Sequence, residues 1–380
     1  MSGSGYLERL LDGVEVEWVP LGHSDFFEVA NNARRPVKAS LREAGANPYY
    51  GANNVQDYVD GFTHDGEFVL IAEDGSASLE QYSVQYAVGK FWANNHVHVL
   101  RGTNAVNTRF LFHSLRIVDF QPFLTGGGRA KLTKGQLVNI PVAIPCPENP
   151  QKSLVIQAEI VRILDAFTAL TAELTAELTA RKTQYNHYRN QLLSFEGEAV
   201  EWRALGDLFH MRAGQHISAK DIEKEASMTH TFPCFGGNGV RGYVQEKSHV
   251  GDFLLIGRQG ALCGNVQRVK GAFYATEHAV VVRATEVMNI DWAYHYLTIM
   301  NLNQYASQGS LPGLAVGNLL NLKIPVPQLA EQTRIANILD KFDTLTTSLS
   351  EGLPREIALR QKQYEYYRNL LLSFPKGDKA

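Results

Sequence analysis

Long apolar runs, a strong excess of charge and paired cysteines are all missing from this sequence, and each absence excludes a class of protein. No segment approaches ~18 uninterrupted apolar residues and the first residues lack a signal-peptide core, so we expect neither a membrane span nor secretion. The three cysteines, Cys146, Cys234 and Cys263, lie far apart, without a Cys-x-x-Cys pair or a histidine cluster at ligand spacing. The sequence therefore predicts no structural zinc site, and the scattered thiols are typical of a cytoplasmic protein.

The net charge of the 380 residues is −3, so no overall positive field indicates a nucleic-acid partner. Positive charge is nevertheless concentrated locally. Residues 121–147 contain no acid but include Arg129, Lys131 and Lys134, and residues 292–330 are also free of acid. A protein that docks with other subunits can confine its positive charge to one such face.

The sequence contains an internal duplication, in which matching segments follow one another in the same order at offsets of roughly 175 to 185 residues. We call the two halves copy one and copy two. The matching segments, with their first residues, are VEWVPLG and VEWRALG (Val16, Val200), PYYGANNVQDYV and PCFGGNGVRGYV (Pro48, Pro233), GEFVLIAEDGSA and GDFLLIGRQGAL (Gly66, Gly251), FWANNH and FYATEH (Phe91, Phe273), LVNIPVAIP and LLNLKIPVP (Leu137, Leu319), QAEIVRILDAF and QTRIANILDKF (Gln157, Gln332), and YNHYRNQLLSF and YEYYRNLLLSF (Tyr185, Tyr364).

Each copy consists of a globular part followed by a long helix. In the globular parts, β-rich runs such as Phe68–Ala72, Phe253–Gly257 and Ala279–Arg283 alternate with turns such as Gly51–Asn54 and Gly236–Gly239. A proline-rich boundary precedes each helix. We therefore predict four segments: a globular domain at 1–148, a spacer helix at 149–196, a second globular domain at 197–327 and a second spacer helix at 328–380.

Apolar residues in both helical segments recur at alternating spacings of four and three, which predicts packing against a partner helix. The tetrapeptide TAEL occurs twice in tandem at Thr171–Leu178, and such an insertion keeps the apolar face nearly aligned because four residues turn ~400°. Pro354 interrupts the second pattern, so we expect a break or kink near Gly352–Pro354. The residues predicted to pack the helices are Ile160, Ile163, Phe167, Leu170, Leu174, Ile335, Ile338, Phe342, Leu345 and Leu349.

The two helices are the obvious partners for one another. The first, from about Gln151 to about Ser194, would be roughly 65 Å long at 1.5 Å per residue. With each domain beside the start of its own helix, antiparallel pairing would hold the domains apart at a fixed spacing. The sequence therefore predicts an α+β fold, in which two pseudo-symmetric mixed α/β domains are separated by a pair of long antiparallel coiled-coil helices.

The duplicated order of these motifs resembles the specificity (S) subunit of type I restriction-modification enzymes. The resemblance covers nearly the full chain and rests on VEW-x-x-LG, an Ile-Pro-Val-Pro-like boundary, Gln-x-x-Ile-x-x-Ile-Leu-Asp-x-Phe and Tyr-Arg-Asn-x-Leu-Leu-Ser-Phe. The TAEL tandem and the YLERLLDGVEVEW start indicate the IC-like branch. The resemblance implies two target recognition domains, each of which reads one half of a bipartite DNA site, and helices that fix the gap between the halves.

The resemblance also implies a chain without a catalytic site of its own. It would dock two methyltransferase (M) subunits, to which two restriction/translocation (R) subunits add, in a complex that acts as a site-specific deoxyribonuclease and adenine DNA methyltransferase. S-adenosylmethionine, ATP and Mg would bind to those partners, and no cofactor or metal to this chain.

Base-edge and phosphate contacts usually come from turn-rich loops on a rigid scaffold, and we expect the DNA contacts of this chain there. The candidates in copy one are Asn53, Asn54, Gln56, Asn94, Asn95, His96, Arg129, Lys131 and Lys134. The candidates in copy two are Asn238, Arg241, Arg258, Gln259, Tyr274, Thr276, His278, Gln308 and Ser310.

Structural roles for some of these residues remain open. Asn53, Asn54 and Asn238 can simply form turns, since Asn and Gly tolerate positive φ, and His96 and His278 can hold the start of a strand. We assign the loop at 126–134 to phosphate, although copy two lacks its three positive residues. We assign to the helix seam, rather than to nucleic acid, the tyrosines Tyr185, Tyr188, Tyr364 and Tyr367. The arginines beside them can bond the last carbonyls of the helix or meet a partner subunit.

Two other functions are weighed against DNA recognition. The first is a methyltransferase, because Asn47-Pro48-Tyr49-Tyr50 approaches an Asn-Pro-Pro-Tyr/Phe loop. It lacks the second proline, and no glycine-rich cofactor turn, P-loop or metal-binding carboxylate set accompanies it, which disfavours an enzyme. The second is a coiled-coil protein-protein scaffold without DNA readout, which a test for sequence preference would distinguish.

Overall fold

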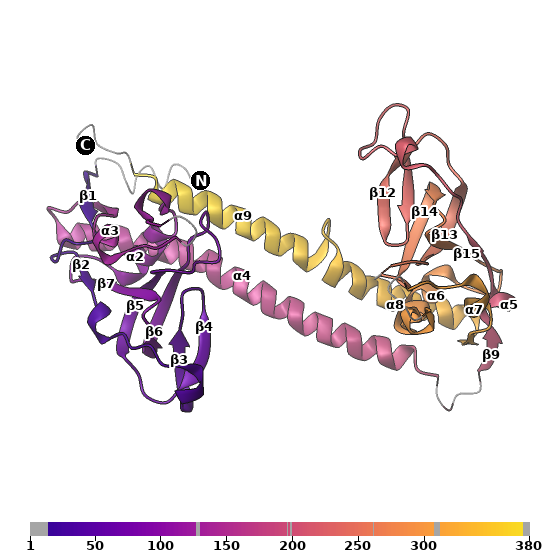
Figure 1. Cartoon of the computed structure of the whole chain (residues 1–380), viewed down its shortest axis with the longest axis horizontal. Helices are drawn as coiled ribbons and strands as arrows, with labels where there is room; N and C mark the ends of the chain where they lie inside the picture. Colours follow the sequence, from indigo (N-terminus) through magenta and orange to yellow (C-terminus); the bar gives the residue numbers. More distant parts are fainter. Residues whose placement is uncertain are drawn as a thin grey trace. The chain divides into compact units, whose positions relative to one another are not determined.

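The computed structural model describes residues 14–126, 130–195, 197, 200–260, 262–307 and 312–374. The chain divides into two compact units: unit 1 comprises residues 1–175 and 356–380, and unit 2 comprises residues 176–355 (Figure 1). Each unit therefore contains one globular domain, the first part of the helix that follows it, and the end of the helix that belongs to the other copy. The boundaries between the two units therefore fall inside both predicted helical segments, between residues 175 and 176 and between residues 355 and 356. The four segments predicted above instead keep each helical segment whole.

The domain of unit 1 is built on a six-stranded sheet of order β2-β7-β5-β6-β3-β4 (Figure 1). Its neighbours are antiparallel except β3 and β6, which run parallel. A separate antiparallel pair joins β1 to β8. The bounds are β1 Val16–Pro20, β2 Phe27–Val29, β3 Ala44–Tyr50, β4 Val55–Val59, β5 His64–Ala72, β6 Val84–Ala93, β7 Val97–Gly102, α2 Thr108–Leu115, α3 Lys134–Leu137 and β8 Pro141–Pro145.

Unit 2 repeats this topology. Its six-stranded sheet has the order β10-β15-β13-β14-β11-β12, the pair β11–β14 is parallel, and β9 pairs with β16. The equivalent strands occupy equivalent places, which confirms the repeat and the two mixed α/β domains. The bounds are β9 Glu201–Ala204, α5 Leu205–Leu208, β10 Phe209–Ala213, β11 Phe232–Gly236, β12 Gly239–Val244, β13 His249–Gly257, β14 Val266–Ala275, β15 Ala279–Ala284, α6 Ile290–Ile299, α7 Val316–Leu320 and β16 Lys323–Val326.

Both faces of each sheet are buried along the central strand. In β5, Phe68 and Leu70 belong to a small cluster on one face, whereas Val69 and Ile71 belong to the main core with α2 and α4. Because successive side chains of a strand point to opposite faces, a strand covered on both sides needs an uninterrupted apolar run. That requirement explains FVLIA in β5 and FLLIG in β13.

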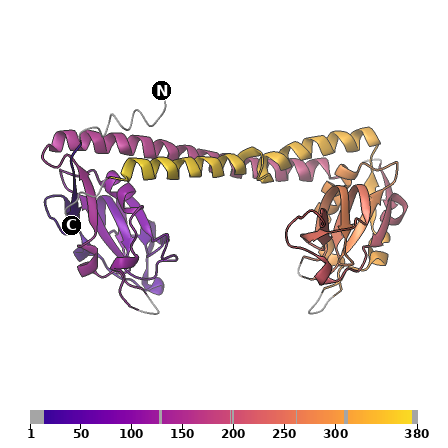
Figure 2. The ribbon, with the colours of Figure 1, turned by 90° about the horizontal axis from the view of Figure 1, so that it is seen from above.

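Long helices pair within each unit. In unit 1 the first part of α4 (Pro150–Leu192) lies beside the last turns of α9 (Gly352–Leu372) and runs in the opposite direction, and Phe167 stacks on Tyr367 at 5.2 Å (Figures 1 and 2). In unit 2 the last turns of α4 lie beside α8 (Leu329–Thr347), and Phe342 stacks on Tyr188 at 5.8 Å. These are equivalent pairs of the repeat, and they confirm that Tyr188 and Tyr367 belong to the helix seam.

The predicted break in the second helix is confirmed, and it corrects one predicted packing residue. Helix α8 ends at Thr347, and α9 begins at Gly352, whose φ of +75° favours glycine. Pro354 then lies in the first turn of α9, where its missing N–H costs little. Leu349 falls between the helices with 83% of its surface exposed, so it does not pack as predicted.

The other predicted seam residues are buried or half-buried. They are Ile160, Ile163, Phe167, Leu170, Leu174, Ile335, Ile338, Phe342 and Leu345.

In the described part of the chain, no helix combines the length and the apolar character that a membrane crossing requires.

Candidate nucleic-acid interface

A buried glutamine in each spacer helix fixes that helix to its domain. Oε1 of Gln157 accepts from the backbone N of Asn107 at 2.8 Å, and its Nε2 donates to the carbonyl of Ala105 at 3.2 Å. In unit 2, Gln332 makes the same bonds to the N of Asn289 and the carbonyl of Val287. Both glutamine side chains are completely buried. Asn107 and Asn289 also cap the N-termini of α2 and α6. We call this set of hydrogen bonds the joint, because it fixes the long helix of each unit to α2 or α6 of the domain.

The aspartate of the same helix motif completes the joint. In unit 1, His113 Nε2 lies 2.8 Å and Arg109 Nε 2.9 Å from Oδ1 of Asp165. In unit 2, Nε2 of His295 lies 2.8 Å from Oδ1 of Asp340, and the arginine that contacts the same oxygen is Arg268, which comes from β14 rather than from α6. Burial lowers the pKa of His113 to about 4, so the neutral ring donates its Nε2–H to the carboxylate. The motif Gln-x-x-Ile-x-x-Ile-Leu-Asp-x-Phe is therefore the element that joins each spacer helix to its domain.

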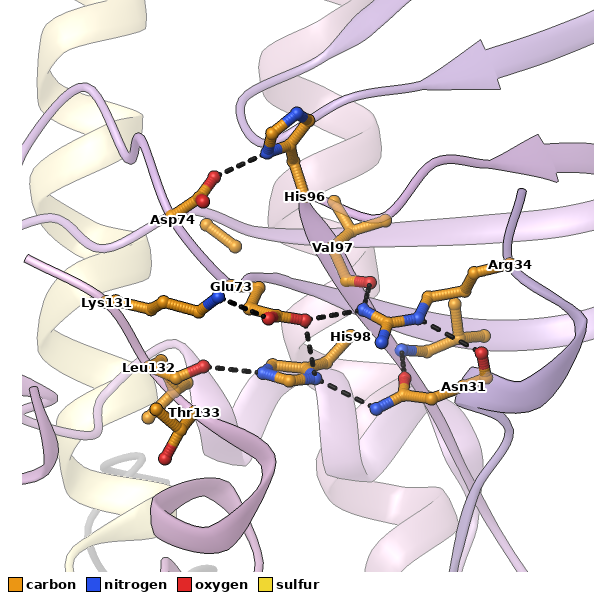
Figure 3. Close-up of polar contacts among 12 residues, drawn as sticks. Asn31, Arg34, Glu73, Asp74, His96, Val97, His98, Lys131, Leu132 and Thr133 are labelled. Carbon is orange, nitrogen blue, oxygen red and sulfur yellow. Dashed lines mark hydrogen bonds and ion pairs between the residues drawn. The ribbon is translucent and has the colours of Figure 1, made fainter. Parts of the chain in front are cut away.

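Three candidates of copy one, Asn53, His96 and Lys131, contact the segment 73–77 directly after β5, and Figure 3 shows the last two. The side chain of Asn53 donates to the carbonyl of Gly75 and accepts from the N of Ala77. His96 Nδ1 lies 2.6 Å from Oδ1 of Asp74. Four loops far apart in the sequence thus meet at one end of the sheet, which is how a rigid scaffold presents a binding surface.

Glu73 occupies the centre of this cluster (Figure 3). Its carboxylate binds Arg34 at 2.7 Å and Lys131 at 3.0 Å. Burial opposes ionisation of Glu73, but the hydrogen bonds from Arg34 and Lys131 lower its pKa below the usual value. The positive charge of Lys131, assigned above to phosphate, is therefore paired with an acid from another loop.

The candidates of copy two converge in the same way on the segment after β13. His278 Nδ1 lies 2.8 Å from Oε1 of Gln259, and Arg258 Nη1 donates to the carbonyl of Glu277. A hollow of about 380 Å³ opens here, and Asn238, Arg241, Gln259 and His278 contribute to its lining. Gly237 permits this approach, because a Cβ at that position would lie 2.9 Å from the carbonyl oxygen of His278.

Several candidates have structural partners. Asn54 accepts from the N of Val55, Asn238 accepts from Asn265, and the hydroxyl of Tyr274 donates to the carbonyl of His216. Two predictions need correction, because the side chains of Asn94 and Thr276 are buried and unavailable to a base. Asn94 instead accepts from the N of His96 and shapes that turn. Gln56, Asn95, Lys134 and Arg241 are exposed. Arg129, Gln308 and Ser310 lie outside the described residues.

The sequence prediction missed Glu73 and Asp74, although a signal was available. They align with Arg258 and Gln259 in the duplicated strand segments, so a residue-by-residue comparison of the copies marks them. The structure places each pair at the same end of its sheet, with an acidic pair in unit 1 and a basic and amide pair in unit 2. Among the residues described, no three His, Cys, Asp or Glu side chains are grouped so that they could hold a metal ion.

Comparison with known proteins agrees with this arrangement. Residues 15–181 and 198–359 each match the family described as "Type I restriction modification DNA specificity domain". The sequence is 46% identical to the type I restriction enzyme EcoprrI specificity subunit of Escherichia coli, over 92% of this chain and 93% of the relative. It is 34% identical to the EcoR124I/EcoR124II specificity subunit of the same species, over 100% and 99%. The fold is similar to the crystal structure of a type I restriction-modification S subunit from M. genitalium, with a TM-score of 0.66, 15% identity and coverage of 96% and 97%.

Proposed function

Because this chain belongs to the family of type I restriction-modification DNA specificity subunits, we propose that it selects the DNA sequence on which such a complex acts. Specificity is the role that the curated relatives carry in their names. The side chains that meet at the sheet ends include hydrogen-bond donors, hydrogen-bond acceptors and charged groups. Contacts with base edges and phosphates require these kinds of groups.

One observation supports a target of two different halves. The two domains have the same strand order and the same joint to a spacer helix, yet the segment after the central strand reads Glu73-Asp74 in one and Arg258-Gln259 in the other. A conserved scaffold with divergent surface residues is expected when two domains perform one task on different ligands. We therefore propose a bipartite site in which each domain reads one half.

The catalytic activities of the complex are proposed to belong to other subunits. In this proposal two M subunits methylate adenine with S-adenosylmethionine, and two R subunits use ATP and Mg²⁺ for translocation and cleavage. The contribution of this chain is recognition and docking, with the two domains held on helices that act as a spacer between the half-sites.

Methylation mapping tests this proposal in the assembled complex. Plasmid DNA from cells that express this chain with its M partner is sequenced for modified adenine, with cells that express the M partner alone as control. We expect modification only with both genes, confined to one bipartite motif. Modification without this chain, or without any common motif, would contradict the proposal.

A binding experiment distinguishes recognition from pure scaffolding. The purified complex of this chain with M is titrated with a duplex that contains the mapped motif and with one that has both halves scrambled. We expect preference for the first duplex and affinity that decreases with salt, because phosphate contacts release counterions. Equal affinity at every salt concentration would identify a protein-protein scaffold.

A further inference from the structure

The segment between β2 and β3 of unit 1 carries a local excess of positive charge. Residues 30–43 contain the basic residues Arg34, Arg35, Lys38 and Arg42 and a single acid, Glu43, so their net charge is +3. The whole chain, in contrast, has a net charge of −3. Positive charge is therefore concentrated in this segment against the overall sign of the protein.

Two of the four basic side chains are neutralised by acids of the same domain. Nη1 of Arg34 lies 2.7 Å from the carboxylate of Glu73 (Figure 3). Nη1 of Arg42 lies 3.3 Å from the carboxylate of Asp57, and its guanidinium lies 4.0 Å from the centre of the Tyr49 ring. Both arginine side chains are largely buried, at 17% and 15% exposure. They hold the segment on the sheet and have little charge to offer to a ligand.

The other two basic side chains, Arg35 and Lys38, are exposed. Within the described ranges of the chain, neither side chain takes part in a hydrogen bond or an ion pair. The backbone that carries them is nevertheless fixed. The N of Arg35 donates to the carbonyl of Ala93 at 3.0 Å, and its carbonyl accepts from Nε1 of Trp92 at 2.7 Å. Two uncompensated positive charges thus project from a backbone that is anchored on the sheet.

These charges lie beside the surface on which the loops of unit 1 converge. Ala93, which binds the backbone of Arg35, is the last residue of β6, and the turn at 94–96 with His96 follows it directly. The parallel pairing of β3 with β6 brings the end of β3 and the turn at 51–54 to the same end of the sheet. The Cα of Lys38 lies at most about 11 Å from that of Arg35, because three residues span no more than ~3.6 Å each.

We infer that Arg35 and Lys38 bind the phosphate backbone of the DNA beside the half-site that unit 1 reads; this inference rests on the proposed function. Arginine and lysine are the usual partners of DNA phosphates, and such contacts set the register of a protein on the duplex without reading its sequence. Lys131 shares the carboxylate of Glu73 with Arg34, whereas Arg35 and Lys38 have no acid to neutralise them among the described residues. Their positive charge remains available to phosphate.

The equivalent segment of unit 2 has the opposite sign of charge. Residues 214–231, between β10 and β11, contain two lysines and three acids, so their net charge is −1 with histidine neutral. These residues are Lys220, Lys224, Asp221, Glu223 and Glu225. Because negative charge repels phosphate, this phosphate contact is confined to unit 1, and the two domains contribute unequally to the electrostatic part of DNA binding.

The salt dependence of binding tests the assignment. Binding of the complex with M to the duplex that contains the mapped motif is measured by fluorescence anisotropy at about 50 to 200 mM salt. The logarithm of the association constant decreases linearly with the logarithm of the salt concentration, with a slope of about −0.9 per phosphate contact. We expect the slope of Arg35→Ala/Lys38→Ala to be smaller in magnitude than that of the wild type by about 1.8. Affinity for the scrambled duplex should decrease by a similar factor, and the selected motif should not change.

The equivalent segment supplies the matched control. Lys220→Ala/Lys224→Ala removes the same charge from exposed positions of unit 2 and should leave the slope unchanged. Arg35→Lys retains the charge and should retain the slope. Thermal unfolding and co-purification with M verify that each variant is folded. The single variants Arg35→Ala and Lys38→Ala, each expected to change the slope by about 0.9, provide the same test if the double variant does not fold.

The outcomes separate this inference from the function on which it rests. An unchanged slope in folded Arg35→Ala/Lys38→Ala would overturn the inference. An equal decrease in both double variants would also overturn it, because the net charge of the protein, and not the segment at 30–43, would then determine the slope. A changed motif in the Arg35→Ala/Lys38→Ala complex would contradict a phosphate contact, since phosphates do not distinguish bases. All three results leave the proposed function intact, whereas a wild-type complex that binds the motif and scrambled duplexes equally would contradict the proposed function itself.

Discussion

Replacement of Gln157 by alanine should loosen the domain of unit 1 from its spacer helix. Gln157 is completely buried, and it bridges α4 to the backbone of Asn107 and Ala105. It also donates to the hydroxyl of Ser153 at 2.9 Å. Alanine removes all three bonds and leaves the N–H of Asn107 and the carbonyl of Ala105 without this partner.

The magnitude follows from those two backbone groups. A buried donor or acceptor that loses its partner costs about 1–3 kcal/mol, and the truncation also leaves a cavity. We expect Gln157→Ala to destabilise the docked state of α2 by about 3 kcal/mol. Gln151→Ala is the matched control, because Gln151 is exposed on the first turn of the same helix and its loss should cost at most about 0.5 kcal/mol.

Hydrogen exchange measured by mass spectrometry localises the effect. A loss of about 3 kcal/mol corresponds to roughly 100-fold faster exchange for amides that open with α2. Gln332→Ala should produce the same acceleration in α6 of unit 2 and leave α2 unchanged. Equal exchange of α2 in Gln157→Ala and Gln151→Ala would refute the assignment of the joint.

Three further predictions concern the spacer, the buried histidine and a charge cluster. Deletion of Thr175–Leu178 removes ~6 Å of α4 and should shorten the unread gap by one or two base pairs without changing either half-site; an unchanged gap in methylation mapping would contradict the spacer role. His113 is neutral when folded because burial lowers its pKa to about 4, whereas the unfolded ring protonates below about 6.5. The stabilisation that neutral His113 contributes is therefore complete above pH 6.5 and decreases as the pH falls toward 4. Urea unfolding should show a free energy of unfolding that decreases by about 2 kcal/mol from pH 7 to pH 5 in the wild type and by less in His113→Gln. Identical pH profiles of the two proteins would contradict this role of His113. Arg268 forms ion pairs with Asp291, Asp340 and Asp343. Arg268→Met should therefore lower the stability of unit 2 by about 2 kcal/mol, which a lower Tm would report. An unchanged Tm would contradict this prediction.

The repeat and the long helices could be predicted because their signals are local or periodic. The heptad pattern predicted helices within a few residues of the observed bounds of α4, and the position of Pro354 predicted the break. Leu349 was assigned wrongly because the spacing continued past the residue at which the helix ends. A pattern of apolar residues cannot show where the backbone stops being helical when the breaker lies five residues later.

The sequence pattern could not predict in the same way which residues form the core of each unit and which loops meet at its surface. Tyr364, Leu371 and Phe374 are buried in the core of unit 1, although at least 200 residues of the chain separate them from the core members of copy one. Lys131 was assigned to phosphate because its own loop contains no acid, but Glu73 reaches it from the end of β5. Such pairings depend on which loops the sheet brings together, and a single sequence carries no direct record of them.

The proposed function requires that two equivalent domains read two halves of one DNA site. The most direct measurement is selection of duplexes from a fully randomised pool by the wild-type complex of this chain with its methyltransferase partner, followed by sequencing. We expect two fixed blocks of different sequence, separated by a constant number of unread bases. A single continuous block, or a pool without any enriched sequence, would contradict it.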